Sequence, residues 1–385
     1  MPPLSLDSRQ LRYSAMAGVG GIGSGMFFAL NHSHTLGREE SRSGRLLDRR
    51  DYCKLHIISH YVKALLGPAF AVYPIGRVGA DEPGRWVMQE MLEAGLDLSQ
   101  VRIGPGEQTL FSFCFQYPDG SGGNLTTDDS ASGHMTPEAV AQAERIFETF
   151  RGRGIVLAAP EVPLDTREAL LEAGAAHLFM RVASFVTSEI APARQRGMME
   201  RIDLLALNLD EAAAVTGEAP KREAPQAVVE KAVEVLRRLS PGLGVSITAG
   251  RHGSWAWDGR TLHHQPALET TVVSTAGAGD AHLAGLIAAA AAGLPLGEAL
   301  QLGNLVAGLS VQSPHTIHKQ IDRDALHEFA RHQTVPWSAA ILELLDDKSG
   351  PPGDTRGQAV AGRGPSNGQR HAPAESDMPA GAHSS

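Results

Sequence analysis

Short apolar runs alternate with segments of helical period through much of the chain. The pattern predicts strands at residues 155–159, 203–207 and 244–248, and helices at residues 166–173 and 225–239. Repeated strand–helix units imply a mostly parallel sheet that is covered on both faces, so an α/β fold is expected. Ligands of such sheets bind beyond the carboxyl ends of the strands, and chemistry is therefore expected in the loops that follow them.

Residues 109–117 have a two-residue period instead. They place aromatic side chains on one face of a strand and end at a Pro-Asp-Gly turn over residues 118–120; the aromatic positions are Phe111, Phe113, Phe115 and Tyr117. This pattern predicts a half-exposed antiparallel hairpin. An ordinary edge hairpin and a lid over the main sheet both fit these residues.

The ends of the chain contain no membrane or export signal of a familiar kind. The N-terminus lacks the sustained apolar stretch of a secretory signal, and the longest apolar run, residues 284–293, is about half of the roughly 20 residues that cross a bilayer. That run predicts a buried helix. Residues 348–385 are rich in Gly, Pro and Ser and have no aromatic residue, so we expect a disordered tail after a folded domain at residues 1–347.

The net charge and the cysteine content indicate which classes of binding partner and which redox setting to expect. The chain has 34 basic and 43 acidic residues, a formal charge of −9, so nucleic acid and membrane surfaces are not expected partners and a small molecule is. A stretch at residues 38–50 is rich in arginine interspersed with acids; it is either a solvated face or a contact for an anionic ligand. Two distant cysteines, Cys53 and Cys114, fit a reducing cytoplasmic setting.

The strongest local signal is a glycine-rich turn that leads into a small-residue helix. Gly277, Ala278 and Gly279 precede Asp280. Backbone amides at such a turn, with the positive end of the helix dipole, favour anionic oxygens. An aspartate there is explained if it accepts a proton from a hydroxyl that attacks a phosphoryl group held by the same amides. The alternative is a simple helix cap.

Two further loops follow predicted strands. Asn208 and Glu211 offer oxygen ligands that suit a hydrated Mg²⁺, or else they form a capping box at a helix start. Thr248, Gly250 and Gly253 form a loop in which the glycines let the backbone approach a flat ring or a phosphate.

Two motifs suggest other functions. Residues 18–23 fit the G-x-G-x-x-G pattern of dinucleotide sites, but the expected acidic residue about 20 positions later falls in a polar segment, so glycines near an acceptor or beneath a lid explain the pattern better. His56 and His60 share a helical face and could bind a metal, although no third ligand lies nearby.

These elements together resemble the PfkB/ribokinase family of carbohydrate and nucleoside kinases over roughly residues 70–320. The resemblance rests on the glycine-rich residues 75–84, Asn208-x-x-Glu211, Thr248-x-Gly250-x-x-Gly253 and Gly277-Ala278-Gly279-Asp280, in that order. It implies a three-layer α/β/α fold with a mostly parallel central sheet and a small β lid, the lid hairpin lying around residues 105–127. In this family the lid often carries dimerisation, so a homodimer through it is a candidate.

The resemblance also implies an ATP-dependent kinase that transfers the γ-phosphoryl group to a hydroxyl of a small polyol, a sugar or sugar derivative. Asp280 would be the base, and the amides of residues 277–279 the anion hole. Asn208 and Glu211 would organise hydrated Mg²⁺, Thr248, Gly250 and Gly253 would contact the nucleotide, and Asn304 would border the adenine. The alternatives are a nucleoside kinase and a non-catalytic nucleotide- or sugar-binding member of the same fold. A non-catalytic member would have no electrostatic reason to keep the Asp280 carboxylate beside a phosphate.

The sequence departs from the family pattern mainly where the acceptor binds. Residues 53–58 replace the usual Gly-Gly-x-x-x-Asn element, and residues 20–25 contain no acid. Residues 274–276 replace the usual Asp-Thr/Ser-Thr, so a monovalent-cation site beside that turn is not assumed. His282 stands where an aromatic or apolar residue is usual. The usual sugar-binding set is therefore not assumed.

Overall fold

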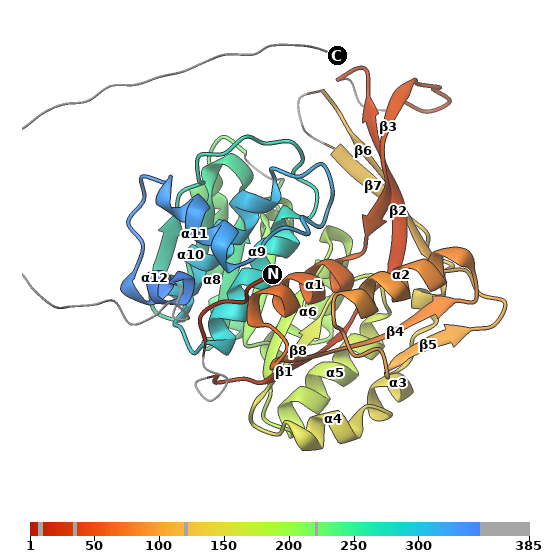
Figure 1. Cartoon of the computed structure of the whole chain (residues 1–385), viewed down its shortest axis with the longest axis horizontal. Coiled ribbons are helices and arrows are strands. Elements are labelled where there is room, and N and C mark those ends of the chain that lie inside the picture. The colour runs from red at the N-terminus through yellow and green to blue at the C-terminus, as the bar shows by residue number, and fades with distance from the viewer. Residues whose placement is uncertain (7–10, 34–36, 119–121, 220–221, 347–385) are drawn as a thin grey trace, which may run out of the picture. The chain divides into compact units, whose positions relative to one another are not determined.

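A nine-stranded sheet forms the centre of the molecule (Figure 1). The computed structural model describes residues 1–6, 11–33, 37–118, 122–219 and 222–346. Across the sheet the strands are β13 (Leu262–Gln265), β12 (Ser254–Trp257), β11 (Gly244–Thr248), β10 (Leu204–Asn208), β9 (Met180–Ser184), β8 (Gly154–Ala158), β1 (Ala15–Val19), β4 (Ala71–Gly79) and β5 (Val101–Gly104). Only the pairs β11–β12 and β12–β13 are antiparallel in this sheet, so the predicted mostly parallel α/β fold is confirmed.

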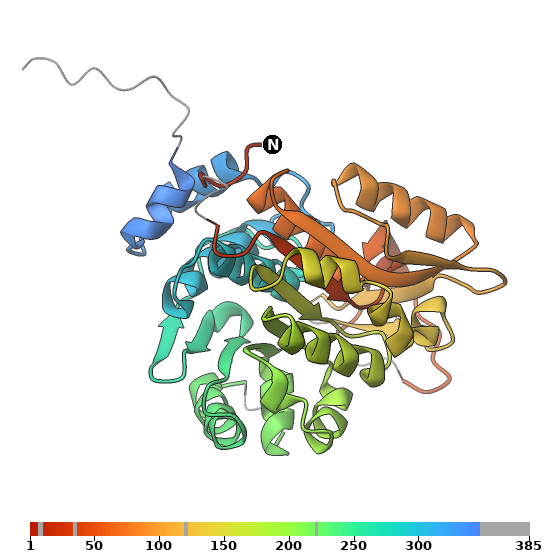
Figure 2. The ribbon, with the colours of Figure 1, turned by 90° about the horizontal axis from the view of Figure 1, so that it is seen from below.

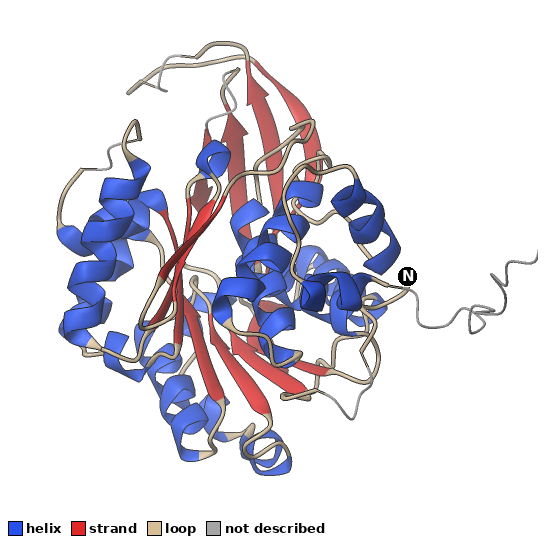
Figure 3. Cartoon of the chain, turned by 90° about the vertical axis from the view of Figure 1, so that its left-hand side faces the viewer, coloured by secondary structure: helices blue, strands red, loops and turns tan. Residues whose placement is uncertain are grey.

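Helices cover both faces of the sheet, as Figures 2 and 3 show. One face carries α1 (Lys54–Leu66), α2 (Glu82–Glu93), α9 (Ala278–Ala291), α10 (Leu296–Ser310), α11 (Arg323–Arg331) and α12 (Ala339–Leu345). The other carries α3 (Pro137–Ala141), α4 (Glu144–Thr149), α5 (Leu164–Ala176), α6 (Ile190–Gln195), α7 (Leu209–Thr216) and α8 (Pro225–Leu239). Neighbouring strand residues alternate between the two cores: Met16 joins the first and Ala17 the second, as the pleat of a doubly covered strand requires.

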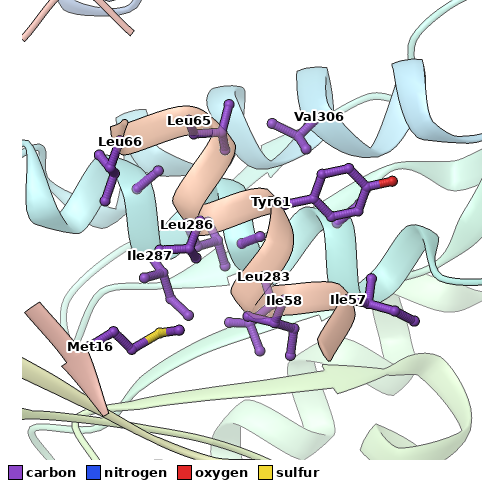
Figure 4. Close-up of a cluster of buried hydrophobic side chains, with 14 of the residues drawn as sticks. Met16, Ile57, Ile58, Tyr61, Leu65, Leu66, Leu283, Leu286, Ile287 and Val306 are labelled. Carbon is purple, nitrogen blue, oxygen red and sulfur yellow. The ribbon is translucent and has the colours of Figure 1, made fainter. Parts of the chain in front are cut away.

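The predicted elements agree closely with the observed ones. Strand β11 and helix α8 have the expected bounds, and β8, β10 and α5 overlap the expected segments. The apolar run at residues 284–293 lies mostly in α9, which is buried between the sheet and helices α1 and α10 (Figure 4). None of the helices in the described part of the chain has the length and apolar character to span a membrane.

A second sheet of four strands forms the predicted lid and projects from the carboxyl end of β1 (Figures 1 and 3). Its order is β3 (Gly44–Tyr52), β2 (Gly23–Leu30), β6 (Leu110–Gln116) and β7 (Gly122–Thr126). Strands β6 and β7 are antiparallel, which confirms the hairpin, whereas β2 and β6 are parallel. The turn at residues 119–121 and the expected tail at residues 348–385 lie outside the described residues.

The faces of the lid hairpin differ in burial. Ser112 and Cys114 are buried, while Phe111, Phe113 and Phe115 on the other face of β6 stay partly exposed. The small polar face therefore turns inward and the aromatic face outward. This orientation brings polar atoms of the lid toward the body of the protein.

Close packing of α9 against α10 depends on glycine. A Cβ atom at Gly285 would lie 2.7 Å from the Cα of Gly303, a backbone atom that cannot move without shifting α10. We expect Gly285→Ala to lower the free energy of unfolding by about 1–3 kcal/mol through overpacking, measured by urea denaturation. Gly242→Ala is the control, because open space surrounds that exposed glycine and its effect should stay within about 0.5 kcal/mol. Equal stability of both variants would contradict this packing.

Candidate active site

A cavity of about 290 Å³ lies between the lid and the N-terminal end of α9. Asp51 and Cys114 line it from the lid strands β3 and β6, and Lys54, Glu161 and Asp280 line it from the body. Glu161 follows strand β8, so the cavity lies at the carboxyl end of the parallel sheet. This is where the sequence pattern placed the chemistry.

The turn before α9 has the geometry that an anion site needs. Gly277 is the N-cap of α9 in the left-handed region, at φ 77°, and a Cβ atom there would lie 2.6 Å from the Thr316 carbonyl oxygen. Only glycine fits this position. The first amides of a helix have no partner inside the helix, although the amide of Ala278 donates to the Thr275 carbonyl oxygen at 3.2 Å. Thr275, Ala276 and Gly277 line the cavity.

Asp280 lies three residues after Gly277, in the first turn of α9, and is only 8% exposed. Its Oδ1 atom accepts a hydrogen bond from Lys54 Nζ at 3.2 Å. Lys54 begins α1, so two helix N-termini meet at this ion pair. The carboxylate of Asp280 raises the pKa of Lys54, which keeps the ammonium charged despite its partial burial.

Glu161 is held in an unusual conformation. Its backbone lies in the left-handed region at φ 74°, which costs a non-glycine residue free energy, and its Oε2 atom is buried with no hydrogen-bond partner among the described residues. Burial raises the pKa of Glu161 to about 7, opposed by the Lys54 ammonium and assisted by the Asp280 carboxylate. A carboxylate with a strained backbone, packed against Gly21 at the wall of a cavity, is typical of a functional site.

Asp51 enters the cavity from the lid. Its Oδ2 atom accepts from the Cys114 thiol at 2.7 Å, and its Oδ1 atom accepts from the Tyr52 amide at 2.9 Å. Burial raises the pKa of Asp51, and the hydrogen bond from Cys114 opposes that rise. Burial likewise raises the pKa of the Cys114 thiol, and the adjacent carboxylate raises it further.

Asn208 and Glu211 form the capping box that was the alternative to a metal site. Asn208 Oδ1 accepts from the Glu211 amide at 2.8 Å, and Glu211 Oε2 accepts from the Asn208 amide at 2.8 Å. Burial raises the pKa of Glu211 to about 7; Lys54 opposes this rise and Asp280 adds to it. The glutamate therefore shares the electrostatic environment of Asp280. Its oxygens suit a hydrated cation, and the described residues contain no closed cluster of three or more protein ligands.

The other candidate residues lie outside the lining of this cavity. Thr248 ends β11, and Gly250 and Gly253 adopt left-handed φ values of 55° and 84° around a short 3₁₀ turn. Asn304 is buried in α10, where its Oδ1 accepts from Ser254 Oγ and its Nδ2 donates to the carbonyls of Gln265 and Pro266. The side-chain amide of Asn304 thus links α10 to the β12–β13 hairpin.

The structure also places the residues of the competing motifs. Gly21 packs so tightly on Glu161 that a Cβ atom would overlap its carboxylate, and Gly23 begins lid strand β2. The glycines therefore lie near the cavity and the lid, as the sequence favoured over a dinucleotide site. His56 and His60 are buried on α1 next to each other, and the described residues give them no third metal ligand.

His282, one of the departures from the family pattern, is buried under the sheet. Its Nε2 atom lies 3.0 Å from Ser246 Oγ, and burial lowers its pKa to about 4. The ring fills the space that Gly303 leaves open, since a Cβ atom at Gly303 would lie 2.8 Å from it. A neutral, hydrogen-bonded imidazole therefore replaces an apolar side chain in the packing of α9.

Sequence reasoning missed three cavity residues: Asp51, Lys54 and Glu161. None belongs to a motif with a fixed spacing to Asp280. The signals available were local ones, a lysine at the start of a predicted helix and an acid directly after a predicted strand and a proline. Either signal is common without functional meaning.

Known proteins resemble this chain in sequence and in fold. The chain is 34% identical over 90 residues to fructoselysine 6-kinase of Escherichia coli, a match that spans 23% of this chain and about a third, 34%, of that protein. It is 25% identical over 240 residues to ribokinase of Lactococcus lactis, covering 62% of this chain and 72% of the relative. The crystal structure of Cryptococcus neoformans ribokinase with ADP superimposes with a TM-score of 0.68 at 21% identity, covering 82% of this chain and 99% of that one.

The family model of the pfkB family carbohydrate kinases matches residues 60–323. That range contains the lid hairpin, the capping-box pair, the glycine loop after β11 and the turn with Asp280. Because the match covers well over half of the 385 residues, the chain belongs to the pfkB family of carbohydrate kinases, which transfer a phosphoryl group to a hydroxyl acceptor.

Proposed function

We propose that this kinase transfers the γ-phosphoryl group of ATP to a hydroxyl of a small polyol, a sugar or sugar derivative, bound in the cavity beneath the lid. The observation that carries the proposal is the position of Asp280. Its carboxylate lines the acceptor cavity, directly after the turn whose amides can hold a phosphoryl group.

In this reaction Asp280 accepts the proton of the attacking hydroxyl as the new O–P bond forms and the bond to the β-phosphate oxygen breaks, releasing ADP. The amides of Gly277 and Gly279 and the dipole of α9 stabilise the negative charge on the transferring group. Lys54 Nζ lies 3.2 Å from Asp280 Oδ1. Once a hydroxyl binds to the aspartate, the ammonium can neutralise negative charge on the transferring phosphoryl group. The lid excludes water, which suppresses hydrolysis of ATP.

Glu211 and Asn208 are the residues that would hold hydrated Mg²⁺ through water. The fit rests on the buried Glu211 carboxylate: burial raises its pKa to about 7, and a divalent cation would stabilise its ionised form. When bound, the ion neutralises phosphate oxygens of the nucleotide. For the nucleotide itself we propose the loop of Thr248, Gly250 and Gly253, with Asn304 beneath it.

A nucleoside is the alternative acceptor. Phe27 on lid strand β2 lines the cavity beside the inward-facing Cys114 and offers a ring on which a base can stack. A sugar is favoured because carboxylates and small polar groups make up much of the remaining lining, which suits a ligand with many hydroxyl donors.

The first prediction concerns the base. Asp280→Asn should bind ATP as the unaltered protein does and lose turnover by at least about a hundredfold, because proton transfer to a positioned group contributes roughly 10²–10⁴-fold. ATP binding by calorimetry and ADP release in a coupled assay measure the two effects. Asp324→Asn on the exposed face of α11 controls for loss of one carboxylate. Intact turnover in Asp280→Asn would refute the assignment of the base.

The second prediction concerns pH. The pKa of Glu211 lies at about 7, so below pH 7 its carboxyl is increasingly protonated and Mg²⁺ must compete with that proton. We expect kcat/KM for ATP to fall as the pH drops through about 7 and a higher Mg²⁺ concentration to move this midpoint downward.

Glu211→Gln should abolish the Mg²⁺-dependent shift of the pH midpoint and lower kcat/KM for ATP by at least about tenfold. The exposed Glu223→Gln should retain that shift. The pKa of Glu161 also lies at about 7, but its titration gives a midpoint that does not follow the metal concentration. A midpoint that is the same at every Mg²⁺ concentration would therefore exclude Glu211 as the metal-organising residue.

We further propose that two copies of the chain associate through their lids. The outer face of the lid presents partly exposed aromatic rings, with Phe28 and Phe113 4.7 Å apart, and Leu125 on β7 is 64% exposed. We expect a dimer in sedimentation velocity that Leu125→Asp converts largely to monomer. Leu342→Asp, on the exposed side of α12, should leave the dimer intact. A monomeric unaltered protein, or equal effects of the two variants, would disprove the lid interface.

A further inference from the structure

The glycine-rich segment at residues 75–84 does not line the cavity beneath the lid, but it contacts the two central lid strands where they leave the body. A Cβ atom at Gly76 would overlap the side chain of Ile22, which directly precedes β2. A Cβ atom at Gly79 would lie 2.6 Å from the amide nitrogen of Thr109, which directly precedes β6. The glycines of this segment therefore allow the backbone of β4 to approach the roots of both strands.

Thr109 is held at the root of β6 by hydrogen bonds from its side chain and its backbone. Its Oγ1 atom accepts from the Gly79 amide at 2.9 Å and donates to Asp81 Oδ1 at 2.5 Å. Its amide donates to Asp81 Oδ2 at 2.8 Å. Both carboxylate oxygens of Asp81 thus bind Thr109, which is only 4% exposed. We call Gly79, Asp81 and Thr109 the lid-root joint.

Asp81 is at the same time the N-cap of α2, where its Oδ1 atom accepts from the Gly84 amide at 2.9 Å. A Cβ atom at Gly84 would lie 2.7 Å from Thr109 Oγ1, so the first turn of α2 also leaves room for the threonine. Partial burial acts to raise the pKa of Asp81, but the hydrogen bonds from Thr109 and Gly84 outweigh it and lower the pKa. An ionised carboxylate therefore ties the lid to a strand and a helix of the body.

Strand β6 connects this joint to the wall of the cavity. Ser112 and Cys114 on β6 line the cavity, and the Cys114 thiol donates to Asp51 on β3. Cys114 follows Thr109 by five residues, roughly 16 Å along the strand. Because β6 pairs with β2 on one side and β7 on the other, a small rotation at Thr109 displaces the whole lid wall.

We propose that Asp81 is a positioning residue for the cavity: by binding the amide and the hydroxyl of Thr109, it fixes the root of β6 and sets the position of the lid wall opposite Asp280. This role goes beyond the phosphoryl transfer proposed above. A lid with a loose root holds an acceptor poorly and admits water to the site.

Thiol labelling of the full-length protein tests the joint without any ligand. The chain has two cysteines, both buried: Cys114 on the lid and Cys53 at the start of α1 in the body. Thr109→Val removes the hydroxyl at nearly constant volume. We expect N-ethylmaleimide to label Cys114 about tenfold faster in this variant and Cys53 within about twofold of its rate in the unaltered protein, as mass spectrometry of the peptides would show.

Matched variants separate positioning from helix capping. Asp81→Asn keeps an oxygen that can cap α2 and loses the second acceptor for Thr109, so it should act like Thr109→Val. Thr109→Ser retains the hydroxyl and should restore slow labelling. Asp322→Asn is the control, because Asp322 caps α11 by accepting from the Ala325 amide at 2.9 Å, away from the lid. Thermal unfolding midpoints verify that each variant is folded.

A kinetic measurement links the joint to the reaction. With the pentose or hexose that the unaltered protein phosphorylates best, Thr109→Val should raise the KM for the sugar at least about tenfold and leave the KM for ATP within about twofold. The difference is expected because the loop of Thr248 and Gly250, which we propose for the nucleotide, belongs to the body.

Unchanged labelling of Cys114 in Thr109→Val and Asp81→Asn, equal acceleration at both cysteines, or the same acceleration in Asp322→Asn would each overturn the proposal. A KM for ATP that rises as much as the KM for the sugar would also overturn it. Faster labelling of Cys114 alone, with no sugar that stimulates ADP release from the unaltered protein, would count against the proposed phosphoryl transfer and support the joint.

Discussion

The candidate active site depends on the ion pair between Lys54 and Asp280, which lie 226 residues apart in the sequence. Each begins a helix on the same face of the sheet, and the pair joins the two helix N-termini at the edge of the cavity. Helix dipoles that converge there add positive potential for the phosphoryl group, while the Asp280 carboxylate raises the pKa of Lys54 and keeps its ammonium charged. The small residues of α9 permit this position of the helix N-terminus, because they let α9 pack closely against both the sheet and α10.

The lid forms one wall of the candidate active site and contributes side chains that can select the ligand. Strand β2 follows directly from β1 in the chain, and the small polar face of β6 turns inward. Asp51 therefore faces Glu161 across the cavity from a different structural layer. The acid that the family pattern places after the first strand is absent from residues 20–25, and glycines there make room for Glu161. In the cavity proposed for the acceptor, carboxylates come from strand β3 and from the segment after β8.

The sequence predicts the framework well because the framework is encoded locally. Residues 244–248 are rich in β-branched side chains and predict a buried strand, and the period of residues 225–239 predicts a helix with one buried face; β11 and α8 have these bounds. Gly277 and Asp280 were found because a left-handed glycine before a helix leaves a short signature. Asn208 and Glu211 were predicted from a different signature, an amide and a carboxylate three residues apart at a helix start, and this pair forms a capping box.

Asp51, Lys54 and Glu161 could not be found this way. Their meaning arises from distances between layers that no spacing in the sequence reports, and from burial that raises the pKa of Glu161 to about 7 only after the chain has folded. His282, a departure from the family pattern, is buried in the packing of α9.

A crystal structure of the protein with a non-hydrolysable ATP analogue and a bound acceptor would test the central claim most directly. The account predicts the γ-phosphate at the turn of residues 277–279 and an acceptor hydroxyl within about 3 Å of Asp280. Phosphates that avoid this turn, or an acceptor that binds away from Asp280 while Lys54 keeps its ion pair, would contradict it.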